Sequence, residues 1–312
     1  MHVLCVTPNI SIDRTVGVPG FGAGKVWRTR RVSVACGGKG VNVARAITAL
    51  GHQATSAGLI AGHLGRLAAD LAEAERLRAV WTEIEGETRV CVIVVDDNGA
   101  TTVINEPGPP IANHHWSRFE RDVAAAATAA DTVCISGSLP PGCPRGGLAG
   151  LIAAARGDGS RPVWVDTSMP ALAEAAAAGP VAIRINADEA AALLGHRPLK
   201  PLELLRAART IAARCGGPVA ITDGGAPAVL VSRENAWQAV PPPIDLVSAV
   251  GSGDCFLAAL MVTLTECTDP GAALRRAVAA GAANARHADA GAIDAAEVAR
   301  LTEETRVVRL DG

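Results

Sequence analysis

Aromatic residues are scarce in this sequence: tyrosine is absent, and all aromatics together make up only 3% of its 312 residues. Alanine, valine, leucine and isoleucine must therefore fill any core that the chain forms. Basic residues are not in excess either, because 29 Lys and Arg stand against 31 Asp and Glu. This balance argues against nucleic acid or a charged membrane surface as the main partner. No apolar run reaches 18 residues, so the sequence predicts no membrane-spanning segment.

Paired cysteines are also missing. The eight cysteines form no C-x-x-C motif, and none lies beside histidine at zinc-finger spacing. Most lie in apolar runs, such as Cys134 in TVCIS, which predicts buried, reduced thiols in a cytoplasmic protein. The N-terminal MHVLCVTPN has no basic region before its short apolar run, so it predicts a first strand rather than a signal peptide.

Short apolar runs alternate with segments of helical spacing. The runs are rich in β-branched residues and predict strands buried on both faces of a parallel sheet, at 132–137, 163–166, 181–186 and 219–224. Segments with helical spacing lie between or beside them, at 146–156, 171–178 and 201–214. This alternation predicts an α/β fold with a doubly wound, mostly parallel sheet flanked by helices. No repeat or long linker divides the chain, which favours one domain over residues 1–312.

Two segments, at about 10–36 and 86–106, lack helical periodicity. The second, TRVCVIVVDDNGATTVIN, contains two β-rich stretches around Asn98-Gly99, a strong hairpin signal. The stretch from Lys25 to Val34 also alternates like a strand. We expect these segments to form a small β-sheet apart from the main one, either as a lid, as a contact with a second copy, or as a plain extension of an edge.

The segment DLVSAVGSGDCFLAALMVTL brings a glycine turn to the start of an apolar helix. Backbone amides at such a helix start attract an anion, and the helix dipole adds positive potential there. Asp254 follows Gly251-Ser252-Gly253 directly. It is either a helix cap or, in phosphoryl transfer, the base that takes the proton from an attacking hydroxyl while the amides hold the γ-phosphate.

A second glycine turn, CGGKGVNVARAITALG, also precedes a helix. It is not a dinucleotide fingerprint, because Val43 stands where the third glycine belongs, and Lys39 does not precede Ser or Thr as in a Walker A loop. It is either a plain tight turn or a site where Lys39 and Asn42 meet sugar hydroxyls and a phosphate.

Two further segments have a structural and a functional interpretation. VAITDGGAPAVLV predicts a β-hairpin with a glycine-rich turn. INADEAAALLG contains Asn186 and Glu189 at N-x-x-E spacing, which is close to a capping box and also suits a magnesium ion held through water.

Together these motifs resemble the phosphofructokinase B family of the ribokinase-like superfamily over essentially the whole chain. GGKGVNVARAITALG and DLVSAVGSGDCFLAAL resemble its two signatures, and the pair is far more specific than either alone. The resemblance implies a single ribokinase-like kinase domain with a β-lid over the sugar, ATP with Mg²⁺ as the donor, and a homodimer formed through the lid.

The resemblance also implies roles by position. Asp254 is similar to the family's catalytic base, and the preceding residues to its anion hole, Gly251, Ser252 and Gly253. The nucleotide-side positions are Thr222, Gly224, Gly225 and Asn284. The sugar-side positions are Asp13, Gly38, Lys39, Asn42 and Ser138. Asn186 and Glu189 match the family's magnesium motif, with the ion held through water.

The branch of the family is indicated by Asn42-Val43-Ala44-Arg45 after GGKG, which resembles the kinases of hexose phosphates. Fructose 1-phosphate, tagatose 6-phosphate and fructose 6-phosphate are the acceptors this branch implies. Arg89 resembles its phosphate-binding arginine, and Lys25 and Lys39 would add charge there; alternatively, Arg89 is an exposed strand charge.

Three positions depart from the family pattern: Ser252 replaces Ala, Cys255 replaces Ser or Ala, and Ile10 replaces Pro. Two other functions stay open. A kinase of an unphosphorylated sugar or nucleoside would use the same base without needing Lys39 and Arg89 together. A non-catalytic regulator would bind nucleotide or sugar with a decayed site, against which the intact Asp254 and its glycines weigh.

Overall fold

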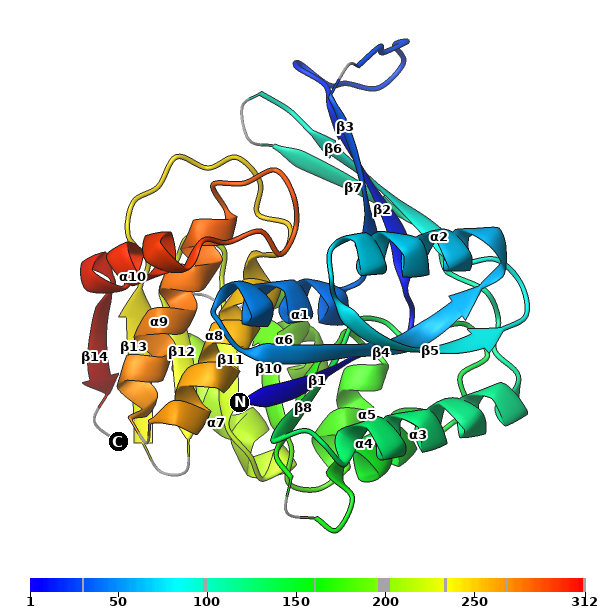
Figure 1. Cartoon of the computed structure of the whole chain (residues 1–312). Helices are drawn as coiled ribbons and strands as arrows, with labels where there is room; N and C mark the ends of the chain where they lie inside the picture. The colour runs from blue at the N-terminus through cyan, green and yellow to red at the C-terminus, as the bar shows by residue number, and fades with distance from the viewer. Residues whose placement is uncertain are drawn as a thin grey trace.

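The computed structural model describes residues 1–29, 31–97, 100–159, 161–195, 203–232, 235–267 and 269–310. Its centre is a ten-stranded sheet flanked by helices (Figure 1). In spatial order the strands are β14 (Arg306–Leu310), β13 (Asn235–Val240), β12 (Ala228–Ser232), β11 (Val219–Thr222), β10 (Ala182–Asn186), β9 (Val163–Asp166), β8 (Thr132–Ser136), β1 (His2–Thr7), β4 (Gln53–Ala61) and β5 (Arg78–Ile84).

Neighbouring strands from β11 to β5 are parallel, whereas β11 through β14 form an antiparallel edge. The predicted mostly parallel sheet is therefore confirmed. The predicted hairpin is also confirmed, since β11 and β12 pair antiparallel across a turn that contains Gly224 at φ +52°.

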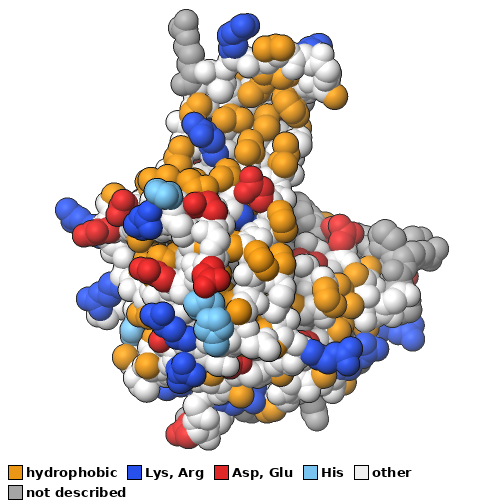
Figure 2. Space-filling model, turned by 90° about the vertical axis from the view of Figure 1, so that its right-hand side faces the viewer, with side chains coloured by type: hydrophobic (Ala, Val, Ile, Leu, Met, Phe, Trp, Pro, Cys, Tyr) orange, Lys and Arg blue, Asp and Glu red, His pale blue; other side chains and the backbone are white. Residues whose placement is uncertain are grey.

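A second sheet of four strands projects from the main body (Figure 1). Its spatial order is β3 (Val32–Gly37), β2 (Ser11–Gly17), β6 (Arg89–Val95) and β7 (Thr101–Asn105). We call it the small sheet. It is separate from the main sheet, as predicted, which excludes the alternative of a plain edge extension. Figure 2 shows hydrophobic side chains gathered along this projecting part.

The strand predicted from Lys25 to Val34 is wrong in its bounds. β3 begins only at Val32. Its partner β2 pairs with it from Ser11↔Gly37 to Val16↔Val32, and this pairing does not extend to residues 25–29. Asn98 and Gly99, the predicted hairpin turn between β6 and β7, lie outside the described residues, although the two strands do pair antiparallel.

Helices cover both faces of the main sheet (Figure 1). Their bounds are α1 (Lys39–Ala49), α2 (Gly62–Ala74), α3 (Asn113–Ala127), α4 (Gly147–Arg156), α5 (Ala171–Ala177), α6 (Ala187–Leu194), α7 (Leu204–Cys215), α8 (Ser252–Glu266), α9 (Pro270–Asn284) and α10 (Ala295–Glu304). One core cluster includes α3, α4, α5 and α7; the other includes α1, α8, α9 and α10. The residues 201–202 of the predicted helix 201–214 lie outside the described residues.

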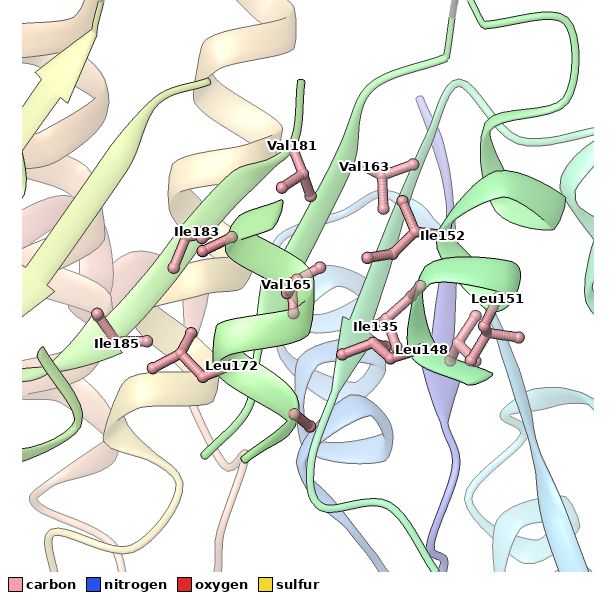
Figure 3. Packing of buried hydrophobic residues seen from close by; sticks show 14 of the residues in the cluster. Ile135, Leu148, Leu151, Ile152, Val163, Val165, Leu172, Val181, Ile183 and Ile185 are labelled. Carbon is pink, nitrogen blue, oxygen red and sulfur yellow. The ribbon is translucent and has the colours of Figure 1, made fainter. Parts of the chain in front are cut away.

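Side chains of β10 alternate between the two cores, as the pleat of a strand requires. Ile183 and Ile185 belong to the core on the α4 side, where Figure 3 shows them beside Leu172 of α5. Ala182 belongs to the opposite core with α8. Arg184 shares that face, and its guanidinium carbon lies 5.7 Å from the ring centre of Phe256 in α8. A strand that is apolar except for its last residue, Asn186, thus carries one buried cation toward α8.

All eight cysteines are free and six of them are buried, as predicted. Within the described ranges, no helix is both long and apolar enough to cross a membrane. The cytoplasmic location inferred from the thiols stays a prediction.

Candidate active site

A cavity of about 470 Å³ lies between the small sheet and the carboxyl ends of the main-sheet strands. Ligand sites of open α/β sheets are found at these strand ends. Many residues singled out in the sequence line this one cavity: Asp13, Gly38, Lys39, Asn42, Arg89, Ser138, Asn186, Glu189, Gly251, Gly253 and Asp254. Residues from more than 200 positions apart in the chain are therefore brought together as the resemblance implied.

Asp254 lies in the first turn of α8 and is 5% exposed. Its Oδ2 accepts a hydrogen bond of 2.8 Å from Nδ2 of Asn42 in α1. Burial, and then the charge of Asp166, raise the pKa of Asp254 to about 7, against the opposing effects of Lys39 and the Asn42 bond. A carboxyl group with a pKa near neutrality is well matched to the work of a general base.

The N-terminus of α8 is built to receive an anion. Its N-cap is Gly251 at φ +86°, not Asp254, and no side chain caps the helix from that position. A Cβ atom on Gly251 would lie 2.7 Å from the backbone nitrogen of Gly291, so glycine is required here. The first amides of a helix have no partner within the helix and carry the positive end of its dipole.

A buried cluster of charges that the sequence analysis did not single out lies beside α8. The carboxylate of Asp166, at the end of β9, is fully buried and lies 2.5 Å from Nζ of Lys39 and 2.8 Å from Nη1 of Arg184. Burial alone would raise the pKa of Asp166, but the charges of Lys39 and Arg184 hold it below its usual range. Two cations are thereby fixed at the cavity wall.

Arg184 links this cluster to the predicted nucleotide side. Its Nη2 donates a 2.6 Å hydrogen bond to Oγ1 of Thr222, at the end of β11. A Cβ atom on Gly253 would lie 2.2 Å from its Nη1, so the guanidinium rests directly against the glycine turn. A lone arginine within the apolar strand VAIRIN was the signal available in the sequence, because an unpaired charge is seldom buried.

The predicted sugar-side residues lie on the small sheet, at the start of α1 and just after β8. Oδ1 of Asp13 accepts a 2.6 Å hydrogen bond from Ser11, and burial raises the pKa of Asp13. A Cβ atom on Gly37 would lie 2.0 Å from the same Oδ1, so Gly37 must be glycine.

Arg89 is half-buried at the start of β6, opposite Ser11. It donates to the carbonyl oxygens of Asn9 and Glu106, each at 3.1 Å from one of its terminal nitrogens. Nδ2 of Asn9 in turn donates to Oγ of Ser138 at 3.1 Å. The guanidinium is thus held in place at the cavity wall, which the interpretation as a plain exposed strand charge does not explain.

Asn186 and Glu189 form a complete capping box at the start of α6, so the structural interpretation of N-x-x-E is confirmed. The other carboxylate oxygen of Glu189 lies 3.7 Å from Nζ of Lys39. Among the described residues, no group of three or more His, Cys, Asp or Glu could hold a metal. A magnesium ion at this place would therefore rely on water and substrate oxygens for most of its ligands.

Several predicted residues lie outside the cavity lining. Thr222, Gly224 and Gly225 lie at the end of β11 and in the turn that follows it, and Ser252 is the first residue of α8. Lys25 lies in the loop between β2 and β3, with its Nζ 5.6 Å from the ring centre of Trp27. Their roles toward a ligand stay predictions.

Asn284 is fully buried at the end of α9. Its Nδ2 donates to the carbonyl of Val250 at 2.9 Å, and its Oδ1 accepts from the amide of Gly291 at 2.8 Å. It therefore braces the loop that leads into the Gly251 turn. The predicted position near the adenine is not tested by these contacts.

The sequence model of the pfkB family of carbohydrate kinases matches residues 1–296. The chain belongs to this family. Sequence relatives of this pfkB-family kinase include a 1-phosphofructokinase of Rhodobacter capsulatus, 37% identical over 85% of this chain and 84% of the relative. A tagatose-6-phosphate kinase of Staphylococcus epidermidis is 27% identical over 99% of this chain and 100% of the relative. The predicted family and branch are confirmed, and the protein is a phosphotransferase with an alcohol group as acceptor.

Solved structures agree with this membership. Phosphofructokinase-2 of Escherichia coli in complex with fructose-6-phosphate superimposes with a TM-score of 0.85 and 27% identity, covering 97% of this chain and 98% of that one. A possible 1-phosphofructokinase of Thermotoga maritima has a TM-score of 0.88 at 22% identity, with full coverage of both chains. The predicted ribokinase-like fold is therefore confirmed.

We expect Asp254→Asn to abolish most turnover of this pfkB-family kinase while leaving substrate binding in place. The amide preserves shape but cannot accept the proton, and a general base typically contributes about 10²–10⁴-fold. Steady-state kinetics and calorimetric binding would measure the two effects separately. A variant with nearly the wild-type kcat would remove Asp254 from the chemistry.

We expect Gly253→Val to be as damaging for a different reason. The added Cβ atom would occupy the place of the Arg184 guanidinium, 2.2 Å from its Nη1, and would displace it from the turn. Circular dichroism should report a folded protein, and kcat should fall by about 10²-fold or more, as when one preorganised donor is lost. Normal activity of a folded variant would place the anion site elsewhere.

The pH dependence should report the Asp254 carboxyl. Only its ionised form accepts a proton, so kcat/KM should rise with pH and level off above the pKa of about 7. Asp166→Asn should move this limb to lower pH, because it removes a neighbouring negative charge that raises the pKa. If the pH at which kcat/KM levels off stays the same in Asp166→Asn, the titrating group is not Asp254.

Proposed function

We propose that this pfkB-family kinase transfers the γ-phosphate of ATP to a hydroxyl group of a hexose phosphate. Fructose 1-phosphate, tagatose 6-phosphate and fructose 6-phosphate are the acceptors to test first. The observation that carries the proposal is the placement of Asp254, with its pKa of about 7, at the glycine-capped start of α8 in a cavity that also contains Lys39 and Arg89. The names of the sequence relatives support the same class of substrate.

In the reaction, the hydroxyl oxygen of the sugar forms a bond to the γ-phosphorus of ATP. The bond between the γ-phosphorus and the bridging oxygen of the β-phosphate breaks, and ADP leaves. Asp254 accepts the hydroxyl proton. The positive end of the α8 dipole, together with Lys39 and Arg184, offsets the negative charge on the phosphoryl oxygens. Asp166 keeps both cations in position through its two ion pairs.

The nucleotide would lie on the side of Thr222 and the Gly224-Gly225 turn, with Asn284 bracing the loop that leads into the turn before α8. Chain neighbours aside, no atom of the described residues lies within 4 Å of a Cβ atom built on Gly224 or Gly225, so the turn is open toward a ligand. Mg²⁺, when bound, would neutralise phosphate charge, held through water by Glu189 and Asn186.

A homodimer through the small sheet is part of the proposal. Apolar side chains are exposed on this sheet and its loop, with Val26 82% and Ile104 58% exposed. Phe21, Val32 and Val34 are exposed there as well. Soluble proteins seldom leave such a patch uncovered, and a second copy of the sheet would cover it.

The Arg89→Ala variant tests whether the substrate is a phosphorylated or an unphosphorylated sugar. Charge-assisted hydrogen bonds to a phosphate are worth roughly 1.5–3 kcal/mol each. Arg89→Ala should therefore raise KM for the hexose phosphate by about tenfold or more, while KM for ATP stays nearly unchanged. The effect on kcat should be much smaller, because ground and transition states lose the same contact.

The matched control is Arg78→Ala. Arg78 also begins a strand, β5, but it is exposed and lies at the amino end of this parallel strand, away from the carboxyl ends that border the cavity. A coupled assay across sugars, nucleosides and sugar phosphates would test all three functions. Preference for a plain hexose or a nucleoside would favour the second candidate, and no turnover with any acceptor would favour a regulator.

A further inference from the structure

The guanidinium of Arg45 in α1 is held by Glu75, the C-cap residue of α2. Nε of Arg45 lies 2.5 Å from Oε2 of Glu75, and its Nη2 lies 2.8 Å from Oε1. This two-point contact fixes the plane of the guanidinium as well as its position. The Arg45 side chain is only 14% exposed, whereas that of Glu75 is 33% exposed.

The same guanidinium also reaches the residue that contacts the base. Its Nη1 donates a 2.9 Å hydrogen bond to Oδ1 of Asn42, three residues earlier on the same helix face. Its Nη2 donates to the carbonyl oxygen of Cys36. Nδ2 of Asn42 then donates to Oδ2 of Asp254 at 2.8 Å. Four side chains thus form one chain of bonds from the surface to Asp254.

The direction of the Asn42 amide depends on Arg45. An amide has a donor end and an acceptor end, and rotating it by half a turn would bring Oδ1 against the Asp254 carboxylate. Arginine can only donate, so it accepts no arrangement other than Oδ1 toward itself and Nδ2 toward Asp254. We propose that Arg45, oriented by Glu75, is a positioning residue that fixes the Asn42 amide and through it the catalytic base. The proposal rests on the assignment of Asp254 as the base.

The charged groups that face Asp254 come from three elements: Lys39 of α1, Asp166 of β9 and Arg184 of β10. The arginine pair of α9, Arg275 and Arg276, lies away from it, since Arg276 contacts Glu266 at the far end of α8. The Asn42 hydrogen bond lowers the pKa of Asp254. Its loss should therefore raise that pKa.

Arg45→Lys keeps the positive charge and removes the two-point contact. We expect the titration midpoint of Asp254 in the ligand-free protein to rise by about one pH unit, the size of one charge-assisted hydrogen bond. Carboxyl carbon NMR of aspartate-labelled protein would measure it, with Asp254→Asn identifying the signal. The kcat should fall by about tenfold at neutral pH, while KM for ATP stays unchanged.

Glu75→Gln separates positioning from simple electrostatics by sign. Removing a negative charge alone would lower the Asp254 midpoint. Loosening the Arg45 guanidinium, and with it the Asn42 amide, would raise it. Because Glu75 lies on the surface, this variant should fold even if the Arg45 variant does not. A raised midpoint supports the proposal, and a lowered or unchanged one overturns it.

Glu266→Gln is the matched control, since it removes a carboxylate from an ion pair with Arg276 at the other end of α8. It should leave the Asp254 midpoint and kcat unchanged. In an Asn42→Ala background, Arg45→Lys should cause no further shift; a shift of the same size there would overturn the proposal.

The NMR readout also keeps two failures apart. Absence of turnover by the wild-type protein with every hexose phosphate would refute the proposed function. An Asp254 titration midpoint that stays at the wild-type value in the Arg45 and Glu75 variants would refute the positioning role alone.

Discussion

The rest of the site depends on the two ion pairs that the buried carboxylate of Asp166 forms with Lys39 and Arg184. A buried ionised group is stable only when its charge is offset, and here Lys39 and Arg184 offset it from two sides. Lys39 begins α1 on the proposed sugar side, and Arg184 donates a hydrogen bond to Thr222 on the proposed nucleotide side. One carboxylate therefore joins the two proposed substrate sides. Removing it would leave the buried Arg184 and the partly exposed Lys39 to repel each other beside the glycine turn.

The same charges govern the proposed base, Asp254. Asp254 is buried as deeply as a core residue, yet it must be ionised to accept a proton. Burial, and then the charge of Asp166, push its pKa upward, whereas Lys39, the Asn42 hydrogen bond and Arg184 pull it down, and the outcome near 7 is a balance of these opposing effects. A site of this kind needs several groups held at fixed distances, which explains why rigid strand ends and helix starts supply them.

Much of this arrangement could be predicted from local patterns. The glycine turns before α1 and α8, the apolar parallel strands and the hairpin of β11 and β12 each have a short-range signature. Elements with mixed composition were missed: β4 carries Gln53, Thr55 and Ser56, and the antiparallel edge strands β13 and β14 alternate with polar residues. Their assignment depends on neighbouring strands, which no local window contains.

The partners of the charges could not be predicted for the same reason. Asp166 and Arg184 are 18 residues apart in the chain, and Glu75 is 30 residues from Arg45. Only the parallel pairing of β9 with β10, and the approach of the C-terminal end of α2 to Arg45 of α1, bring them into contact. Their residue types were visible in the sequence, but the geometry that gives them a role was not.

The alternation of side chains along β10 has a consequence for the evolution of the chain. Sliding this strand by one residue would exchange its two faces, which would move Arg184 into the aliphatic core beside Leu172 and bring an isoleucine to Asp166. A strand with apolar residues on both faces has little else to define its register. The ion pair between Arg184 and Asp166 therefore also fixes the register of β10. Insertion or deletion of a single residue within this strand should be tolerated far less than substitution of its isoleucines by other apolar residues.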